Sequence, residues 1–192
     1  NQRKIIVNNS NNINHKGALQ ADGVTFMSKD SSDYYHEGLY FNSETVDSLT
    51  YVRNCIFKHA HTAITLVSSS PSITSNIFSY NNLSIHIGAY SSPLIRNNVF
   101  RDNERGIKIT SDQNLDIAQS LGGSVEHSNS FQNNSVYALD CDVGNGGFVF
   151  SIDAINNYWG STTGPTHSAN PEGVGDQIND YNGTINYLPF ST

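Results

Sequence analysis

Three stretches of the chain share one pattern: YVRNCIF (51–57), SITSNIF (72–78) and LIRNNVF (94–100). Their final Phe residues lie 21 and 22 positions apart. An aliphatic residue stands five positions before each Phe, and two more stand seven and nine positions after it. The spacing of two is typical of strand alternation. A unit with two or three such short strands cannot bury its own apolar face, so the repeat predicts a solenoid of stacked units.

The pattern continues on both sides of these three copies. Less regular copies lie at 21–26 with a second strand at 37–41, at 125–139 after an insertion near 112–123, and at 153–159. Trp159 stands where the other copies have Phe. Residues 3–7, with the sequence RKIIV, end in three aliphatic residues, and we interpret them as a strand already inside the stack.

The repeat predicts an all-β fold, a single-stranded parallel β-helix with coils of about 22 residues. Asn and Ser, 25 of each, punctuate the apolar residues, and the usual helix formers are scarce. No Asn-Gly or Asp-Gly hairpin turn joins the strands of the three regular copies, and no amphipathic helix lies between them. We expect one domain, with coils over 1–159 and a C-terminal capping segment over 160–192, as part of a longer chain or assembly.

Asparagines recur at two positions of the repeat. Two residues before the Phe position stand Asn76, Asn98, Asn129 and Asn157, with Cys55 in the first full copy. Stacked at one turn, these amides would hydrogen-bond along the axis as a buried ladder. A second row three residues after the Phe is interpreted as exposed turns: Asn81, Asn103 and Asn134. Cys55 and Cys141 fall in different coils and are expected to be unpaired thiols, with Cys55 buried.

Charge and the lengths of the apolar runs argue against nucleic acid and a membrane as partners. The chain has 10 Lys and Arg against 17 Asp and Glu, a formal net charge of -7. Nucleic-acid binding needs clustered cations, which this composition does not supply. No apolar run approaches the roughly 18 residues of a spanning helix, so membrane insertion is not expected.

With the repeats placed, the chain resembles right-handed parallel β-helix proteins of the pectin lyase-like superfamily. The repeated Ile-x-x-Asn-x-Phe, with its aliphatic pair and Ser-Ser-Pro turn, is similar to the tandem repeats of that group. The segments 156–160, 164–167 and 187–190 resemble a closing segment of secreted and surface β-helix proteins. The resemblance implies a right-handed helix and an extracellular or cell-surface setting. It implies no single activity, because the group contains lyases, hydrolases, epimerases, carbohydrate binders and structural stalks.

Two enzyme classes of this superfamily were compared with the chain. The hydrolase pattern consists of adjacent Asp residues, a Gly-His-Gly segment and an Arg-x-Lys segment. The chain lacks this pattern, and Arg105 and Lys108 only weakly resemble its Arg-x-Lys segment. A lyase would hold calcium with acidic residues and use an Arg or Lys as base. Arg105 and Lys108 are the candidate bases, and the candidate calcium ligands are Asp112, Asp116, Asp140 and Asp142. Asp112 and Asp142 are expected to stack on each other, although solvated loop acids beside an insertion are the favoured interpretation.

Aromatic residues suggest a binding surface for sugars. Exposed rings stack on pyranose faces, which makes a platform of Tyr34, Tyr35, Tyr80 and Tyr90 a candidate carbohydrate site. The same residues could instead pack across turns. Acceptor sequons for N-glycosylation occur at Asn8, Asn82, Asn133 and Asn182.

The sequence therefore favours a non-catalytic extracellular β-helix module. It would be a structural or adhesive element of a surface protein or filament-like assembly, with polysaccharide, further copies of itself or another surface protein as its partner. It would require no cofactor. The alternative is a polysaccharide-acting enzyme, above all a calcium-assisted lyase.

Overall fold

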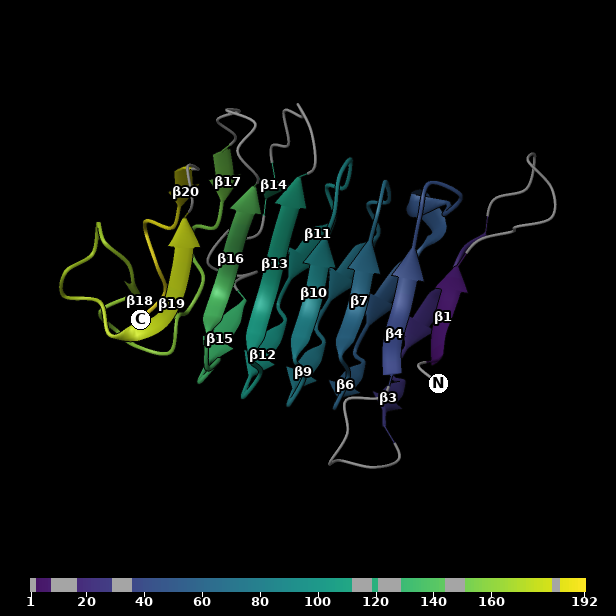
Figure 1. Ribbon diagram of the computed structural model, residues 1–192, viewed down its shortest axis with the longest axis horizontal. Helices are drawn as coiled ribbons and strands as arrows, with labels where there is room; N and C mark the ends of the chain where they lie inside the picture. The colour runs from purple at the N-terminus through teal and green to yellow at the C-terminus, as the bar shows by residue number, and fades with distance from the viewer. Residues whose placement is uncertain are drawn as a thin grey trace.

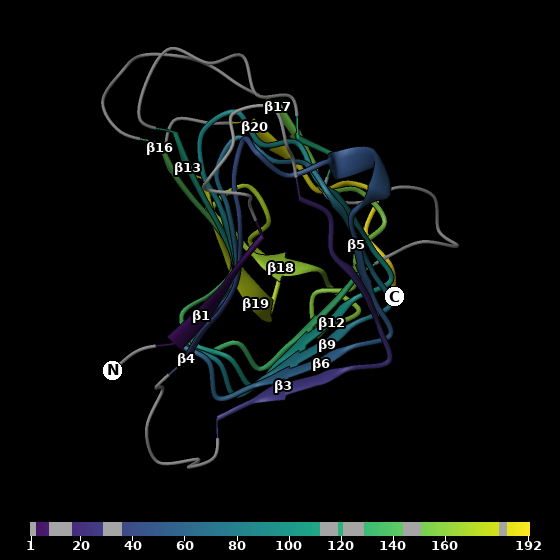
Figure 2. The same cartoon turned by 90° about the vertical axis from the view of Figure 1, so that its right-hand side faces the viewer.

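The computed structural model describes residues 3–7, 17–28, 36–111, 119–120, 129–143, 151–180 and 184–192. Short strands stand side by side along the long axis of the molecule (Figure 1). Seen along that axis, they form the sides of a coil around a central core (Figure 2). All the paired strands are parallel, as a solenoid of stacked coils requires.

The first sheet has eight strands in the order β1-β4-β7-β10-β13-β16-β19-β18. Their bounds are β1 (Arg3–Val7), β4 (His36–Phe41), β7 (Thr62–Leu66), β10 (Leu83–Ile87), β13 (Arg105–Ser111), β16 (Tyr137–Val143), β19 (Gly175–Asp180) and β18 (Pro165–Thr166). The N-terminal strand pairs with β4 from Lys4 opposite Gly38 to Val7 opposite Phe41. The prediction that residues 4–7 pair with a neighbouring coil is thus confirmed.

Two further faces complete each coil. The second sheet contains β2 (Gln20–Asp22), β5 (Tyr51–Arg53), β8 (Ser72–Thr74) and β11 (Leu94–Arg96). The third contains β3 (Thr25–Met27), β6 (Ile56–Lys58), β9 (Ile77–Ser79), β12 (Val99–Arg101) and β15 (Ser130–Gln132). A smaller sheet is formed by β14 (Gln119–Ser120), β17 (Ser151–Asp153) and β20 (Thr184–Asn186). Among the described residues, the one short helix is the 3-10 turn η1 (Asp47–Leu49), and no helix there is long and apolar enough to cross a membrane.

The core is a stack of equivalent residues, one from each coil. The rings of Phe26, Phe57, Phe78, Phe100, Phe131 and Trp159 lie nearly parallel, with neighbouring centroids 4.7 to 5.0 Å apart. Aliphatic rows lie beside them, including Ile64, Ile85, Ile107 and Leu139 from the first sheet. The 22-residue repeat and the parallel β-helix are therefore confirmed.

The predicted asparagine ladder is present. The Asn76 amide donates to Asn98 Oδ1 at 3.0 Å, Asn98 donates to Asn129 at 3.2 Å, and Asn129 donates to Asn157 at 3.2 Å. Each acceptor oxygen also takes the backbone N–H of the preceding asparagine in the row. All four side chains are buried. The ladder therefore satisfies turn N–H groups that no strand partner reaches.

The interpretation of the second asparagine row as exposed turns is wrong. Asn81, Asn103 and Asn134 are buried. Asn81 Nδ2 donates to Asn103 Oδ1, and Asn103 Nδ2 donates to Asn134 Oδ1, both at 3.0 Å. This turn encloses its backbone as tightly as the first one does, so its N–H groups also need internal acceptors.

Residues from 160 onward extend the sheets and close the core. Strand β19 pairs with β16, and β20 pairs with β17. Ile185 and Tyr187 are buried in the same apolar cluster as Trp159, and Phe190 packs against it. Both cysteines are buried and unpaired, as expected.

Candidate functional site

The candidate lyase residues meet on the outer face of the first sheet. Strands β13 and β16 pair with Lys108 opposite Asp140 and Thr110 opposite Asp142. Lys108 Nζ lies 3.0 Å from Asp142 Oδ2 and 4.0 Å from Asp140 Oδ2. The structure thus brings both candidate bases and two of the four candidate acids together, but as ion pairs with one another.

Asp140 is the buried centre of this group. Arg105 Nε lies 3.4 Å from Asp140 Oδ2, and Asn179 Nδ2 donates to Asp140 Oδ1 at 2.8 Å. The Arg105 guanidinium also contacts Glu104. Asp140 Oδ1 therefore accepts a hydrogen bond, whereas Oδ2 lies within ion-pair distance of Arg105 and Lys108 without a hydrogen bond from Arg105 Nε.

The expected stacking of Asp112 on Asp142 is wrong, because Thr110 is the residue opposite Asp142. Leu139 lies eight residues after Phe131, whereas its partner Ile107 lies seven after Phe100. Stacking Asp112 on Asp142 would have required this coil to be one residue shorter than its neighbour, whereas it has gained one residue before β16. Asp112 and Asp116 lie outside the described residues. Within those residues, no group of three His, Cys, Asp or Glu side chains could hold a metal ion.

The candidate tyrosines are separated in the fold. Tyr80 and Tyr90 are 46% and 67% exposed and lie in the turns before and after β10. The Tyr80 ring stacks on His59, with centroids 5.7 Å apart. Tyr34 and Tyr35 lie outside the described residues. The two described tyrosines are therefore in separate turns, at opposite ends of one strand.

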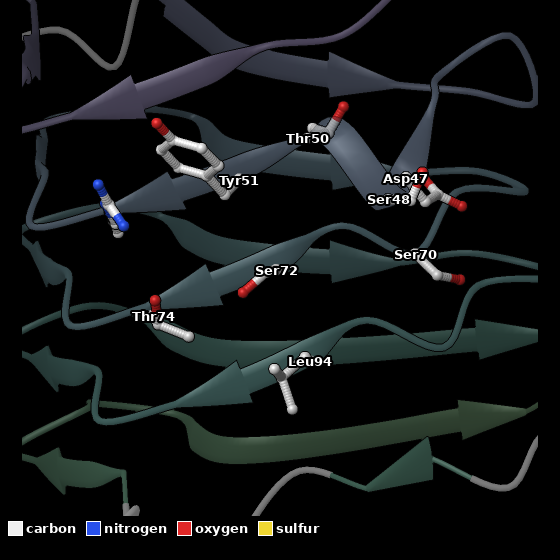
Figure 3. Close-up of a pocket in the computed structure, with 9 residues that line it drawn as sticks. Asp47, Ser48, Thr50, Tyr51, Ser70, Ser72, Thr74 and Leu94 are labelled. Carbon is white, nitrogen blue, oxygen red and sulfur yellow. The ribbon is translucent and has the colours of Figure 1, made fainter.

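A different site, which the sequence did not suggest, lies on the outer face of the second sheet. It is an open groove of about 450 Å³ beside η1 (Figure 3). Its lining comes from three successive coils and from the η1 turn: Asp47, Ser48, Thr50, Tyr51, Arg53, Ser70, Ser72, Thr74 and Leu94. The arrangement places an aromatic ring, an arginine and several hydroxyls in one depression.

Strand alternation produces the floor of the groove. Val52, Ile73 and Ile95 are fully buried in the core, so the residues on either side of each point outward. In register, Tyr51 lies beside Ser72 and Ser72 beside Leu94, while Arg53 lies beside Thr74. Figure 3 shows this row running across β5, β8 and β11.

Arg53 is held on the floor by two neighbours. Its Nε and Nη2 lie 2.9 and 2.8 Å from Asp22 Oδ2, and its guanidinium lies 4.6 Å from the centroid of the Tyr51 ring. Asn54 Nδ2 donates to the other oxygen of Asp22 at 2.8 Å. The hydrogen bond from Asn54, followed by that from Arg53, holds the pKa of Asp22 below its usual value. Arg53 is therefore oriented along the sheet, and its charge is balanced by Asp22.

The wall is fixed by hydrogen bonds of the η1 segment. Ser69 Oγ donates to Asp47 Oδ1 at 2.7 Å, and the buried Thr50 Oγ1 donates to the Val46 carbonyl at 2.8 Å. In the described part of the chain, the hydroxyls of Ser48, Ser72 and Thr74 have no protein hydrogen-bond partner. They are available to a ligand in the groove.

The comparisons with known proteins identify the fold. A family model described as "Right handed beta helix region" matches residues 3–185. No curated protein and no solved structure matched the chain.

Proposed function

Because the chain belongs to the family of right-handed β-helix proteins, we propose that it is a non-catalytic extracellular module that binds carbohydrate. The binding site is the groove over the second sheet, and the stacked coils are the rigid scaffold that presents it. The observation that carries the proposal is the lining of the groove, in which Tyr51 is followed in register by the hydroxyl residue Ser72.

The chemistry of the groove suits a saccharide. Sugar rings bind through an apolar contact to an aromatic or aliphatic surface and through hydrogen bonds to their hydroxyls. Tyr51 and Leu94 supply apolar contacts at the two ends of the floor, and Ser72 lies between them. Because the floor belongs to strands anchored by buried Val52 and Ile73, the site is preorganised.

The calcium-assisted lyase is less well supported as an alternative. A catalytic base must reach the substrate proton, and a calcium ligand must offer free oxygens. Lys108 is instead ion-paired with Asp142. Asp140 Oδ1 accepts a hydrogen bond from Asn179, and Asp140 Oδ2 is ion-paired with Arg105. Loading calcium there would require these ion pairs to separate.

A polysaccharide panel, scored for binding and for release of unsaturated products with and without calcium, tests the proposal. We expect binding that survives chelation of calcium, without product release. Tyr51→Ala should weaken binding at least tenfold, whereas Tyr90→Ala, which removes a more exposed ring outside the groove, should not. Calcium-dependent product release would support the lyase alternative, and loss of binding in Tyr90→Ala alone would place the site elsewhere.

A further inference from the structure

We infer that the groove over the second sheet prefers neutral saccharides to uronate or sulfated chains. This inference rests on the proposed carbohydrate-binding function and specifies its ligand. It differs from the acidic polysaccharide that a calcium-assisted lyase would act on, and it follows from how the charges of the groove are arranged.

Arg53, the only cation that lines the described groove, is already paired with a carboxylate. Arg53 directs Nε and Nη2 at a single oxygen of Asp22, so its fork is occupied from one side. A ligand carboxylate would be left with the Nη1/Nη2 edge for a bidentate contact. It would then share one guanidinium with Asp22, and the two negative charges would repel each other.

The other charge in the lining is negative. Asp47 lies on the wall, where Ser69 Oγ binds its Oδ1. In the described residues no lysine, arginine or histidine pairs with Asp47. Asp22 behind Arg53 adds a second carboxylate just outside the lining. Arg96, which follows Thr74 in the same row, adds a second guanidinium just outside the lining, so the groove and its surroundings carry no excess of positive charge.

The polar groups fit hydroxyls better than anions. A carboxylate such as Asp47 accepts hydrogen bonds, so it matches a sugar O–H and opposes a second carboxylate. The hydroxyls of Ser48, Ser72 and Thr74 both donate and accept, as sugar hydroxyls do. The floor from β5 to β11 covers two coil steps, roughly 10 Å at the usual strand spacing. That length suits a short stretch of a neutral glycan chain.

The test measures binding of cello-, xylo- and manno-oligosaccharides against oligogalacturonate by titration calorimetry at low salt. We expect at least one neutral series to bind the wild-type protein at least tenfold more tightly than oligogalacturonate. Neutral binding should change less than twofold when sodium chloride is added, because no ion pair with the ligand is formed.

Asp22→Asn is the informative variant, since it retains the shape of the side chain and removes the negative charge that balances Arg53. It should strengthen oligogalacturonate binding at least fivefold. Asp102→Asn removes the same charge from a turn outside the groove and should change that affinity less than twofold.

Two outcomes separate the inference from the proposed function. In the first, the wild-type protein binds oligogalacturonate more tightly than any neutral series, and Tyr51→Ala abolishes that binding. This result would overturn the neutral preference while keeping the site. Absence of binding by all the saccharides would overturn the proposed function and this inference with it. Equal gains in Asp22→Asn and Asp102→Asn would show that overall charge, rather than Arg53, sets the preference.

Discussion

Asp176 ends the second asparagine ladder by binding Asn134. Its Oδ2 accepts the backbone N–H of Asn134 at 2.8 Å and the side-chain amide at 2.7 Å. The acceptor at the C-terminal end of the ladder is therefore a carboxylate from strand β19. Burial raises the pKa of Asp176 above its usual value, although the hydrogen bonds from Asn134 act in the opposite direction.

Asp176→Asn should stabilise the protein at neutral pH. Since the folded pKa lies above the unfolded value, the stability contributed by this group is complete below the unfolded pKa and declines as pH rises through the folded pKa. An asparagine oxygen keeps both bonds without a buried charge. We expect a higher unfolding midpoint in urea at neutral pH, and a smaller loss of stability between acidic and neutral pH. Asp142→Asn, at an exposed site, is the control; a lower midpoint for Asp176→Asn would contradict the prediction.

Asn98→Leu should destabilise the protein by about 1–3 kcal/mol for the partners left unpaired. The substitution removes the acceptor of the Asn76 amide and the donor to the Ile73 carbonyl, both within the core. Asn103→Leu should cost a similar amount, because the second row is buried in the same way. Urea unfolding monitored by circular dichroism measures both. Gln132→Leu, at an exposed strand position, is the control, and a loss as small as that of the control would argue against the ladders.

Gly106 and Ser84 occupy equivalent positions in neighbouring coils, but replacement by alanine should destabilise the protein only at Gly106. A Cβ on Gly106 would lie 2.5 Å from the Ala138 carbonyl oxygen and 3.1 Å from the Phe131 ring. Gly106→Ala should therefore cost about 1–3 kcal/mol through overpacking. Ser84 already carries a Cβ, and its buried hydroxyl has no hydrogen-bond partner in the described residues. Ser84→Ala should leave the unfolding midpoint unchanged or raise it, and a loss comparable to that of Gly106→Ala would contradict this.

Thiol titration checks the cysteines. Cys55 and Cys141 are buried and unpaired, and burial raises the pKa of Cys141, which leaves little of the reactive thiolate. We expect slow reaction with a disulfide reagent in the native protein and two reactive thiols after denaturation without reductant. Fewer than two thiols in the denatured protein would indicate a disulfide that this fold does not contain.

The sequence by itself determined the stack of coils. Each copy places a Phe, an aliphatic pair and a buried asparagine at fixed offsets, and strand alternation converts those offsets into inward and outward positions. Phe57, Phe78 and Phe100 had to align once the coils stacked, because any other register would bring apolar residues to the surface. The ladder of Asn76, Asn98, Asn129 and Asn157 followed from the same offsets.

Only the tertiary structure decided what the turns and irregular segments do. Asn81 and Asp102 both lie in turns after strands of the third sheet, yet only the asparagine row is enclosed. The extra residue before Leu139 places Asp142 opposite Thr110. The η1 turn lies beside Tyr51 and forms one wall of the groove. Asp176 ends the ladder at Asn134, although the two residues lie 42 positions apart in sequence. The last three of these features depend on where residues outside the repeat fold back onto the coils, and the repeat period carries no information about that.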